Sequence, residues 1–108
     1  MRDKLLQIIN RYGIEHQQRK LEEEVFELQQ AITRLEYYTD EEIPENMVEY
    51  EFNKTFKLYD NLEEEIADVQ VLLEQIKLYY DLIDKKIELY MKKKVDRQLE
   101  RIENEKNK

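Results

Sequence analysis

Apolar residues recur at alternating steps of four and three along two long stretches of the chain. The first set is Leu21, Val25, Leu28, Ile32 and Leu35, and the second is Leu62, Ile66, Val69, Leu73, Ile76 and Tyr80. An α-helix turns by about 100° per residue, so this spacing gathers each set into one stripe. We therefore predict two amphipathic helices, over about residues 14–38 and 61–80.

Two weaker helical patterns flank these stripes. Leu5, Leu6, Ile8 and Ile9 predict a short helix that ends at Gly13, and a last helix is predicted over about residues 81–102. The chain of 108 residues holds one glycine and one proline, too few turn signals for a β-sandwich or barrel. The sequence predicts a single all-α domain over residues 1–108, a compact bundle of four to five helices.

The stretch between the two stripes is harder to interpret. Residues 39–46 contain Pro44 and are typical of a loop, whereas Phe52, Phe56 and Tyr59 suit one face of a short helix. Asp60, followed by a glutamate three residues later, resembles a capping box and predicts the start of the second long helix. We treat about residues 39–59 as an insertion between the long helices.

Composition excludes several classes of function. There is no cysteine, which removes disulfides, thiolate metal sites and thiol nucleophiles, and the single histidine removes any site that needs two imidazoles. A net charge of −8 argues against nucleic acid as a partner. No apolar run reaches the roughly 18 residues of a membrane span, and the start lacks the apolar stretch of a signal peptide. We expect a cytoplasmic protein that does not bind membranes.

The two stripes carry an internal repeat. The eight residues 21–28, LEEEVFEL, match residues 62–69, LEEEIADV, position by position, 41 residues apart. Each copy contains two acids separated by two residues. These pairs are Glu24 with Glu27 and Glu65 with Asp68.

Helical geometry indicates where these acids point. With each stripe at 0°, Glu24 and Glu65 fall at about −60°, and Glu27 and Asp68 at about −120°. All four therefore share one flank at the edge of the stripe. If the two central helices pack antiparallel through their stripes, four carboxylates converge on one cleft.

A divalent cation would relieve the repulsion and desolvation of four clustered carboxylates. Because the ligands are all oxygens, Mg²⁺ fits best, with Mn²⁺ as a second choice. A di-iron site would require a Glu-x-x-His on each of two helices, and His16 lies in no such motif. The competing interpretation is that the glutamate runs are solvated faces, which accounts well for the acids that point away from the stripe.

The paired acidic motifs resemble the MazG-like group of all-α nucleotide pyrophosphohydrolases. Residues 13–32 and 61–79 are similar to short MazG-like proteins encoded by phages and bacteria. Near the C-terminus, Lys94-Val95-Asp96-Arg97 partly resembles the basic Lys-Phe-x-Arg-Arg motif of the family. The chain departs from the family in the long insertion, in Gln98 at the position of the second arginine, and in Lys92 where an asparagine often stands.

The resemblance implies a Mg²⁺-dependent hydrolase that converts a nucleoside or deoxynucleoside triphosphate to the monophosphate and pyrophosphate. It implies that the metal-binding and catalytic residues are Glu24, Glu27, Glu65 and Asp68. Lys94 and Arg97 would hold the triphosphate, unless they only complement the dipole at the end of their helix. Gln17 and Lys20 lie on the flank of the acids, ahead of the first motif, and would touch base, sugar or phosphate unless they are simply solvated.

The number of apolar residues outside the stripes predicts assembly. Phe26, Leu72, Leu78, Tyr79 and Leu82 exceed what so short a monomer can cover. The resemblance also implies dimers or pairs of dimers, so we expect a two-fold symmetric homo-oligomer. The alternative to an enzyme is a non-catalytic helical interaction or adaptor protein with solvated acidic faces.

Overall fold

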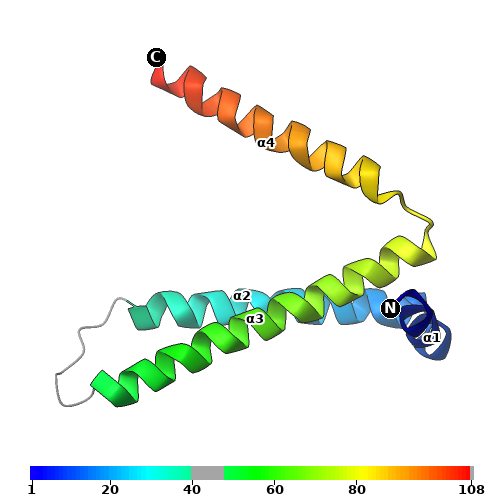
Figure 1. Cartoon of the computed structure of the whole chain (residues 1–108), viewed down its shortest axis with the longest axis horizontal. Helices are drawn as coiled ribbons and strands as arrows, with labels where there is room; N and C mark the ends of the chain where they lie inside the picture. The colour runs from blue at the N-terminus through cyan, green and yellow to red at the C-terminus, as the bar shows by residue number, and fades with distance from the viewer. Residues whose placement is uncertain (40–47, 108) are drawn as a thin grey trace.

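The protein is all-α, as predicted. The computed structural model describes residues 1–39 and 48–107, and within these ranges it contains four helices and no strand (Figure 1). The helices are α1 (Arg2–Tyr12), α2 (Ile14–Thr39), α3 (Val48–Tyr79) and α4 (Asp84–Lys106). None of these helices is long and apolar enough to cross a membrane.

The break between the first two helices depends on Gly13. Its φ of 87° and ψ of 152° belong to a region of backbone conformation that residues with a side chain rarely adopt. The Gly13 N–H donates to the carbonyl of Ile9 at 2.7 Å and closes the end of α1. The chain can therefore change direction within one residue, which places α1 across the end of α2 and α3 (Figure 1). Leu5 and Ile9 are the buried residues of α1.

Helices α2 and α3 lie side by side and antiparallel, and together we call them the hairpin (Figure 1). The predicted start of the second long helix at Asp60 is wrong, because α3 is one helix of 32 residues that already begins at Val48. Neither glycine nor proline occurs between these two residues to interrupt it. Part of the predicted insertion thus extends the second central helix, and residues 40–47 lie outside the described residues.

The hairpin packs through a face that is rotated from the predicted stripe. On α2, Val25 and Ile32 are exposed, whereas Glu24 and Ala31 are buried. The buried and half-buried positions centre about 50° from the stripe, toward the acids. Ala31 is small, which lets the backbones approach closely on this side. The contact between the helices therefore includes acidic flank positions that the sequence placed at its edge.

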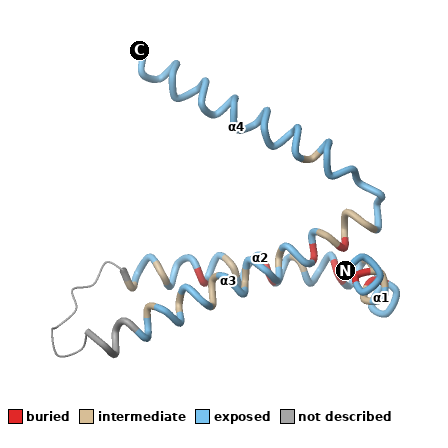
Figure 2. The backbone as a smooth tube through the Cα atoms, in the orientation of Figure 1, coloured by how far each residue is buried: buried red, intermediate tan, exposed pale blue. Residues whose placement is uncertain are grey.

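The single chain is less compact than predicted. Its radius of gyration is 19.3 Å, against about 13 Å for a globular domain of this length. Helix α4 diverges from the hairpin and forms the second arm of a V, and it contributes no buried residue (Figure 2). The physical reason is that the turn before α4 directs this helix away from α2 and α3.

Candidate metal centre

The internal repeat brings three carboxylates together between the central helices. Glu24 and Glu27 come from α2 and Glu65 comes from α3. One carboxylate oxygen from each of them lies within 4.8 Å of the other two. Such a group of oxygen ligands from two helices has the chemistry of a site for a hard divalent cation. We call these three residues the acid cluster.

Burial distinguishes the members of the acid cluster. Glu24 is only 6% exposed, Glu65 is half-buried and Glu27 is exposed. The Oε2 atoms of Glu24 and Glu65 are buried and have no hydrogen-bond partner in the described part of the chain. An unpaired buried carboxylate oxygen is costly, so both atoms suit coordination of a cation. The all-oxygen donor set therefore fits Mg²⁺ or Mn²⁺.

The electrostatics of Glu65 reflect the crowding of negative charge. Burial raises the pKa of the Glu65 carboxyl above its ordinary value, because desolvation disfavours the charged form. The charges of Glu27, Asp68 and Glu24 raise this pKa further. Asp68 itself is exposed and does not belong to the acid cluster, but it is close enough to act on Glu65.

Lys20 provides one positive charge beside the acid cluster. Its Nζ lies 3.3 Å from Oε1 of Glu24 and 3.6 Å from Oε2 of Glu23. The hydrogen bond to Glu24 and the charge of that residue raise the pKa of the Lys20 ammonium above its ordinary value. Lys20 thus neutralises one oxygen of Glu24 and leaves the other oxygen of the same carboxylate without a partner.

A buried pair of amides holds the hairpin next to this site. Gln17 Nε2 donates to Gln75 Oε1 at 2.8 Å, and His16 Nδ1 lies 2.7 Å from Gln17 Oε1, to which it donates. Gln17, predicted to contact substrate, thus faces α3 and is buried. Sequence reasoning missed Gln75. The sequence feature that could have indicated Gln75 is its spacing of three residues after the apolar Leu72, which puts both on one side of α3. The structure shows that this side is buried.

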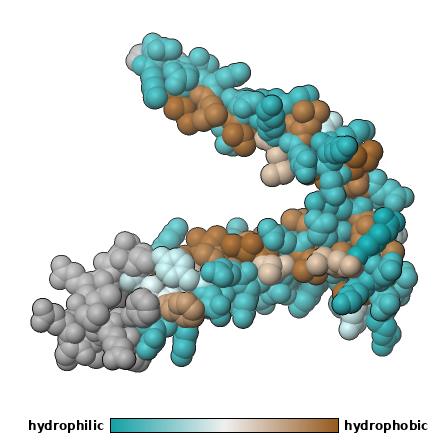
Figure 3. Space-filling model, in the orientation of Figure 1, coloured by the Kyte–Doolittle hydropathy of each residue, from teal (hydrophilic) through white to brown (hydrophobic). Residues whose placement is uncertain are grey.

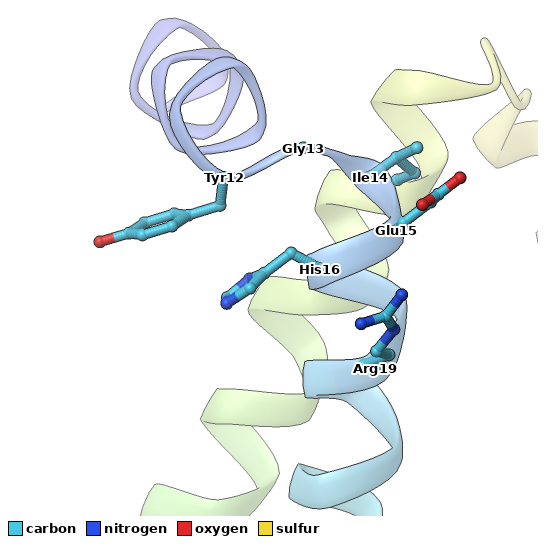
Figure 4. Close-up of a pocket in the computed structure, with 6 residues that line it drawn as sticks. All are labelled: Tyr12, Gly13, Ile14, Glu15, His16 and Arg19. Atoms are coloured by element: carbon cyan, nitrogen blue, oxygen red, sulfur yellow. The ribbon is translucent and has the colours of Figure 1, made fainter.

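A recess opens beside the amide pair, at the corner between α1 and α2. It has a volume of about 570 Å³ and is lined by Tyr12, His16, Gln17, Arg19, Lys20 and Glu23. Figure 4 shows the adjoining part of this corner, where Tyr12 and His16 extend to the same side. Their rings stack with centroids 5.1 Å apart. Lys20 lines this recess and pairs with Glu24, so one side chain of α2 connects the recess with the acid cluster.

The structure does not bring Lys94 and Arg97 to the acid cluster within one chain. Both are exposed on α4, which diverges from the hairpin (Figure 1). Their predicted contact with phosphate stays a prediction. Of the four acids predicted to converge, Glu24, Glu27 and Glu65 come together on the two facing helices, and Asp68 does not join them. The spacing of the acids is local to each helix, whereas the direction of α4 is not.

Comparisons with protein-family models, with curated proteins and with solved structures found no match to this chain. The class that the fold and the site define is therefore an all-α protein with an acidic cluster suited to a metal ion. The resemblance to the MazG-like group rests on the two acidic motifs and the partial basic motif alone.

Proposed function

We propose that this protein is a Mg²⁺-dependent nucleotide pyrophosphohydrolase. The observation that carries the proposal is the convergence of Glu24, Glu27 and Glu65, with two buried oxygens that lack any partner in the described chain. Solvated glutamates would instead point apart into water, as Glu22 and Glu63 do.

The acid cluster would hold the metal ion, which when bound supplies the positive charge that a polyphosphate and its attacking water require. The chain has a net charge of −8, so it needs such a charge to bind an anionic substrate. Lys20 lies beside the acid cluster and also lines the recess, and Arg19 lines the recess as well. We assign Lys20 to the phosphate oxygens, because hydrogen bonds between charged groups are the stronger ones.

Asp68 is exposed, lies outside the acid cluster and is close enough for its charge to act on Glu65. We assign it to the attacking water. In the proposed reaction the water oxygen attacks the α-phosphorus, the bond from that phosphorus to the oxygen bridging to the β-phosphate breaks, and a carboxylate oxygen of Asp68 takes the proton. The products are the nucleoside monophosphate and pyrophosphate, and no side-chain nucleophile is needed.

The recess supports a nucleotide rather than inorganic polyphosphate as the substrate. Its volume lies in the range of about 300–1,000 Å³ that is typical of small-molecule sites. Tyr12 and His16 offer flat faces on which a base can stack, and Lys20 offers a cation on the side of the acid cluster. The order along α2 is therefore ring, cation, carboxylate, which matches the order of base and phosphates in a nucleotide.

The test is a screen for pyrophosphate release from natural and deoxynucleoside triphosphates in the presence of Mg²⁺ or Mn²⁺. Glu24→Gln and Glu65→Gln should lose both turnover and stabilisation by the metal. Asp68→Asn should lose turnover and keep most of the stabilisation, because we place it outside the acid cluster. Glu63→Gln is the matched control and should retain both. If no triphosphate is hydrolysed by the wild-type protein, the proposal fails.

One observation favours the rival function, an adaptor protein. Helix α4 contributes no buried residue, and its apolar positions other than the half-buried Ile87 are exposed, as expected of a surface that binds another protein. An adaptor requires no metal, so it predicts no pyrophosphate release and no effect of Mg²⁺ on thermal stability. The screen and a thermal titration together separate the two functions.

A further inference from the structure

Lys20 is the cation that the folded chain itself supplies to the acid cluster. Its Nζ lies 3.3 Å from Oε1 of Glu24. Among residues 1–39 and 48–107, no other lysine, arginine or histidine pairs with a member of the cluster. Three carboxylates therefore share one ammonium, and the metal-free cluster keeps a surplus of negative charge.

The ammonium of Lys20 stands between two carboxylates, and only one of them belongs to the acid cluster. Its distance is 3.3 Å to Oε1 of Glu24 and 3.6 Å to Oε2 of Glu23. These partners follow Lys20 by four and three residues on α2, so rotation of side chains alone brings either of them into contact. The side chain of Glu24 is 8% exposed, whereas that of Glu23 is 66% exposed and lines the recess. A change of partner thus carries the ammonium from the acid cluster to the rim of the recess.

An ammonium and a divalent cation oppose each other at Glu24. Oε2 of Glu24 is buried and has no partner in the described part of the chain, so it is the atom of this residue that suits the metal ion. Lys20 holds Oε1 of the same carboxylate. One negative charge would then face three positive charges, and each cation would weaken the binding of the other. Burial of Glu24 strengthens this effect, because buried charges are screened less by water and salt.

Lys20 is suited to leave Glu24 when the two cations compete. Its side chain is 46% exposed, and lysine carries a compact, well-hydrated charge on a flexible stem. Figure 3 shows mainly hydrophilic side chains where α1 crosses the end of the hairpin, the corner at which Lys20 lines the recess. The ammonium therefore stays hydrated while it changes partner. A metal ion has more to gain from the site, because it binds oxygens of three residues and Lys20 contacts only one of them.

We propose that Lys20 is the exchangeable counter-ion of the acid cluster, which neutralises Glu24 in the metal-free protein and moves to Glu23 when a divalent cation binds. The inference rests on the metal site of the proposed function and gives Lys20 a positioning role there. After the exchange, the ammonium lies at the recess, where an anionic group of a substrate can meet it. Metal binding thus prepares the recess for an anion, and by linkage an anion that binds Lys20 favours metal binding.

The first test measures the affinity for metal alone, with Mn²⁺ as the probe and no nucleotide. The free ion is followed by electron paramagnetic resonance. Lys20→Gln removes the opposing charge and should lower the dissociation constant for Mn²⁺ at least about fivefold. Lys20→Met should do the same without a hydrogen-bonding group, and Lys20→Arg, which keeps the charge, should bind Mn²⁺ no more tightly than the wild type.

Arg19→Gln is the matched control for the loss of positive charge. Arg19 precedes Lys20, is likewise exposed and lines the same recess, but it does not pair with the acid cluster. Its charge is screened by water, so the dissociation constant should change by less than about twofold. Circular dichroism should show equal helix content in all these variants, because every substituted side chain is exposed on α2.

The second test asks whether Glu23 receives the ammonium. Glu23→Gln removes the second partner, keeps Lys20 on Glu24 and should raise the dissociation constant for Mn²⁺ more than Glu22→Gln does. Glu22 is the exposed neighbour of Glu23 and has no ion pair with Lys20. The extra effect of Glu23→Gln should vanish when Lys20→Gln is already present, because Glu23 acts on the metal through Lys20. A double-mutant cycle measures this coupling.

The results separate this inference from the proposed function. A wild-type protein that binds no Mn²⁺ overturns the metal site and the inference with it. If the wild type binds Mn²⁺ and Lys20→Gln and Lys20→Met bind it no more tightly, only the inference fails. It also fails if Arg19→Gln gains as much affinity as Lys20→Gln, since the effect would then be one of net charge. An effect of Glu23→Gln that is equal with and without Lys20 overturns the exchange.

Discussion

Stabilisation by Mg²⁺ is the most direct consequence of the acid cluster. Without a cation, three carboxylates from two helices meet between α2 and α3, and burial together with neighbouring charges raises the pKa of Glu65. An ion that binds only the folded protein must stabilise it by mass action. We therefore expect the midpoint of thermal unfolding to rise when Mg²⁺ is added to the metal-free protein.

The expected size follows from the linkage relation. At a concentration 100 times the dissociation constant, one bound ion contributes about 2.7 kcal/mol, and each further tenfold increase adds about 1.4 kcal/mol. For a chain of about 100 residues, 1 kcal/mol corresponds to about 4–8 °C. The midpoint should thus rise by about 10–20 °C at that concentration and keep rising with the logarithm of the concentration.

The assay is differential scanning fluorimetry or calorimetry over a Mg²⁺ titration, with ionic strength matched by NaCl. The protomer concentration is held constant, because the midpoint of an oligomer depends on it. Glu24→Gln and Glu65→Gln should abolish the Mg²⁺-dependent rise, since each removes a ligand oxygen that is buried without a partner. Glu22→Gln and Glu63→Gln change exposed members of the same glutamate runs and should leave the rise unchanged.

Two results would refute the reasoning. The first is a wild-type midpoint that responds to Mg²⁺ no more than to NaCl at equal ionic strength. The second is an equal reduction of the rise in all four variants, which would mean that Mg²⁺ only screens the diffuse negative charge of the hairpin. The acid cluster would then be a group of solvated or locally paired glutamates.

Three further predictions concern the fold. The pKa of Glu65 is raised in the folded protein, so its contribution to stability is complete below the ordinary pKa of 4.5 and is lost as the pH rises through the folded pKa. Urea titrations of the metal-free protein should therefore show a loss of stability over this pH range. The loss should be smaller in Glu65→Gln. Gln75→Ala leaves the buried Nε2 of Gln17 without its acceptor and should cost about 1–3 kcal/mol by urea denaturation, whereas Gln70→Ala, at an exposed position of the same helix, should cost under about 0.5 kcal/mol. Gly13→Ala should cost about 1–3 kcal/mol by the same measurement, although nothing lies within 4 Å of the new Cβ, because the backbone conformation itself is strained; an unchanged midpoint would show that the chain turns there in another way.

The helices and the site are recoverable from the sequence to different degrees. Periodicity located α1, α2 and α4 within a few residues, since it records which side of each helix is apolar. It misplaced the start of α3 because a capping-box pattern also fits the interior of a continuous helix when no breaker precedes it. The repeat placed Glu24, Glu27 and Glu65 on facing helices, because equal spacing from two similar stripes implies equal angles.

The exact face of contact depended on tertiary packing. An apolar stripe covers a wide arc of a helix, and the helix can pack through either edge of that arc without any change in the spacing of its apolar residues. The acidic edge became the contact because Ala31 is small and because Gln17 and Gln75 satisfy each other there. No pattern within one helix shows which edge becomes the contact, because Gln17 and Gln75 are 58 residues apart in the chain and their hydrogen bond forms only when the two helices pack.

By itself, the sequence determined that the chain is helical, that two of its helices are long and amphipathic, and that their acids share one flank. These properties depend on spacing along a single helix, where 100° per residue converts position into direction. Only the tertiary structure decided that Glu24 is buried and that α4 points away from the hairpin. The burial of Glu24 depends on the rotation of about 50° between the apolar stripe and the contact face, and the direction of α4 depends on one turn of four residues. In both cases packing between helices chooses among arrangements that have the same apolar pattern.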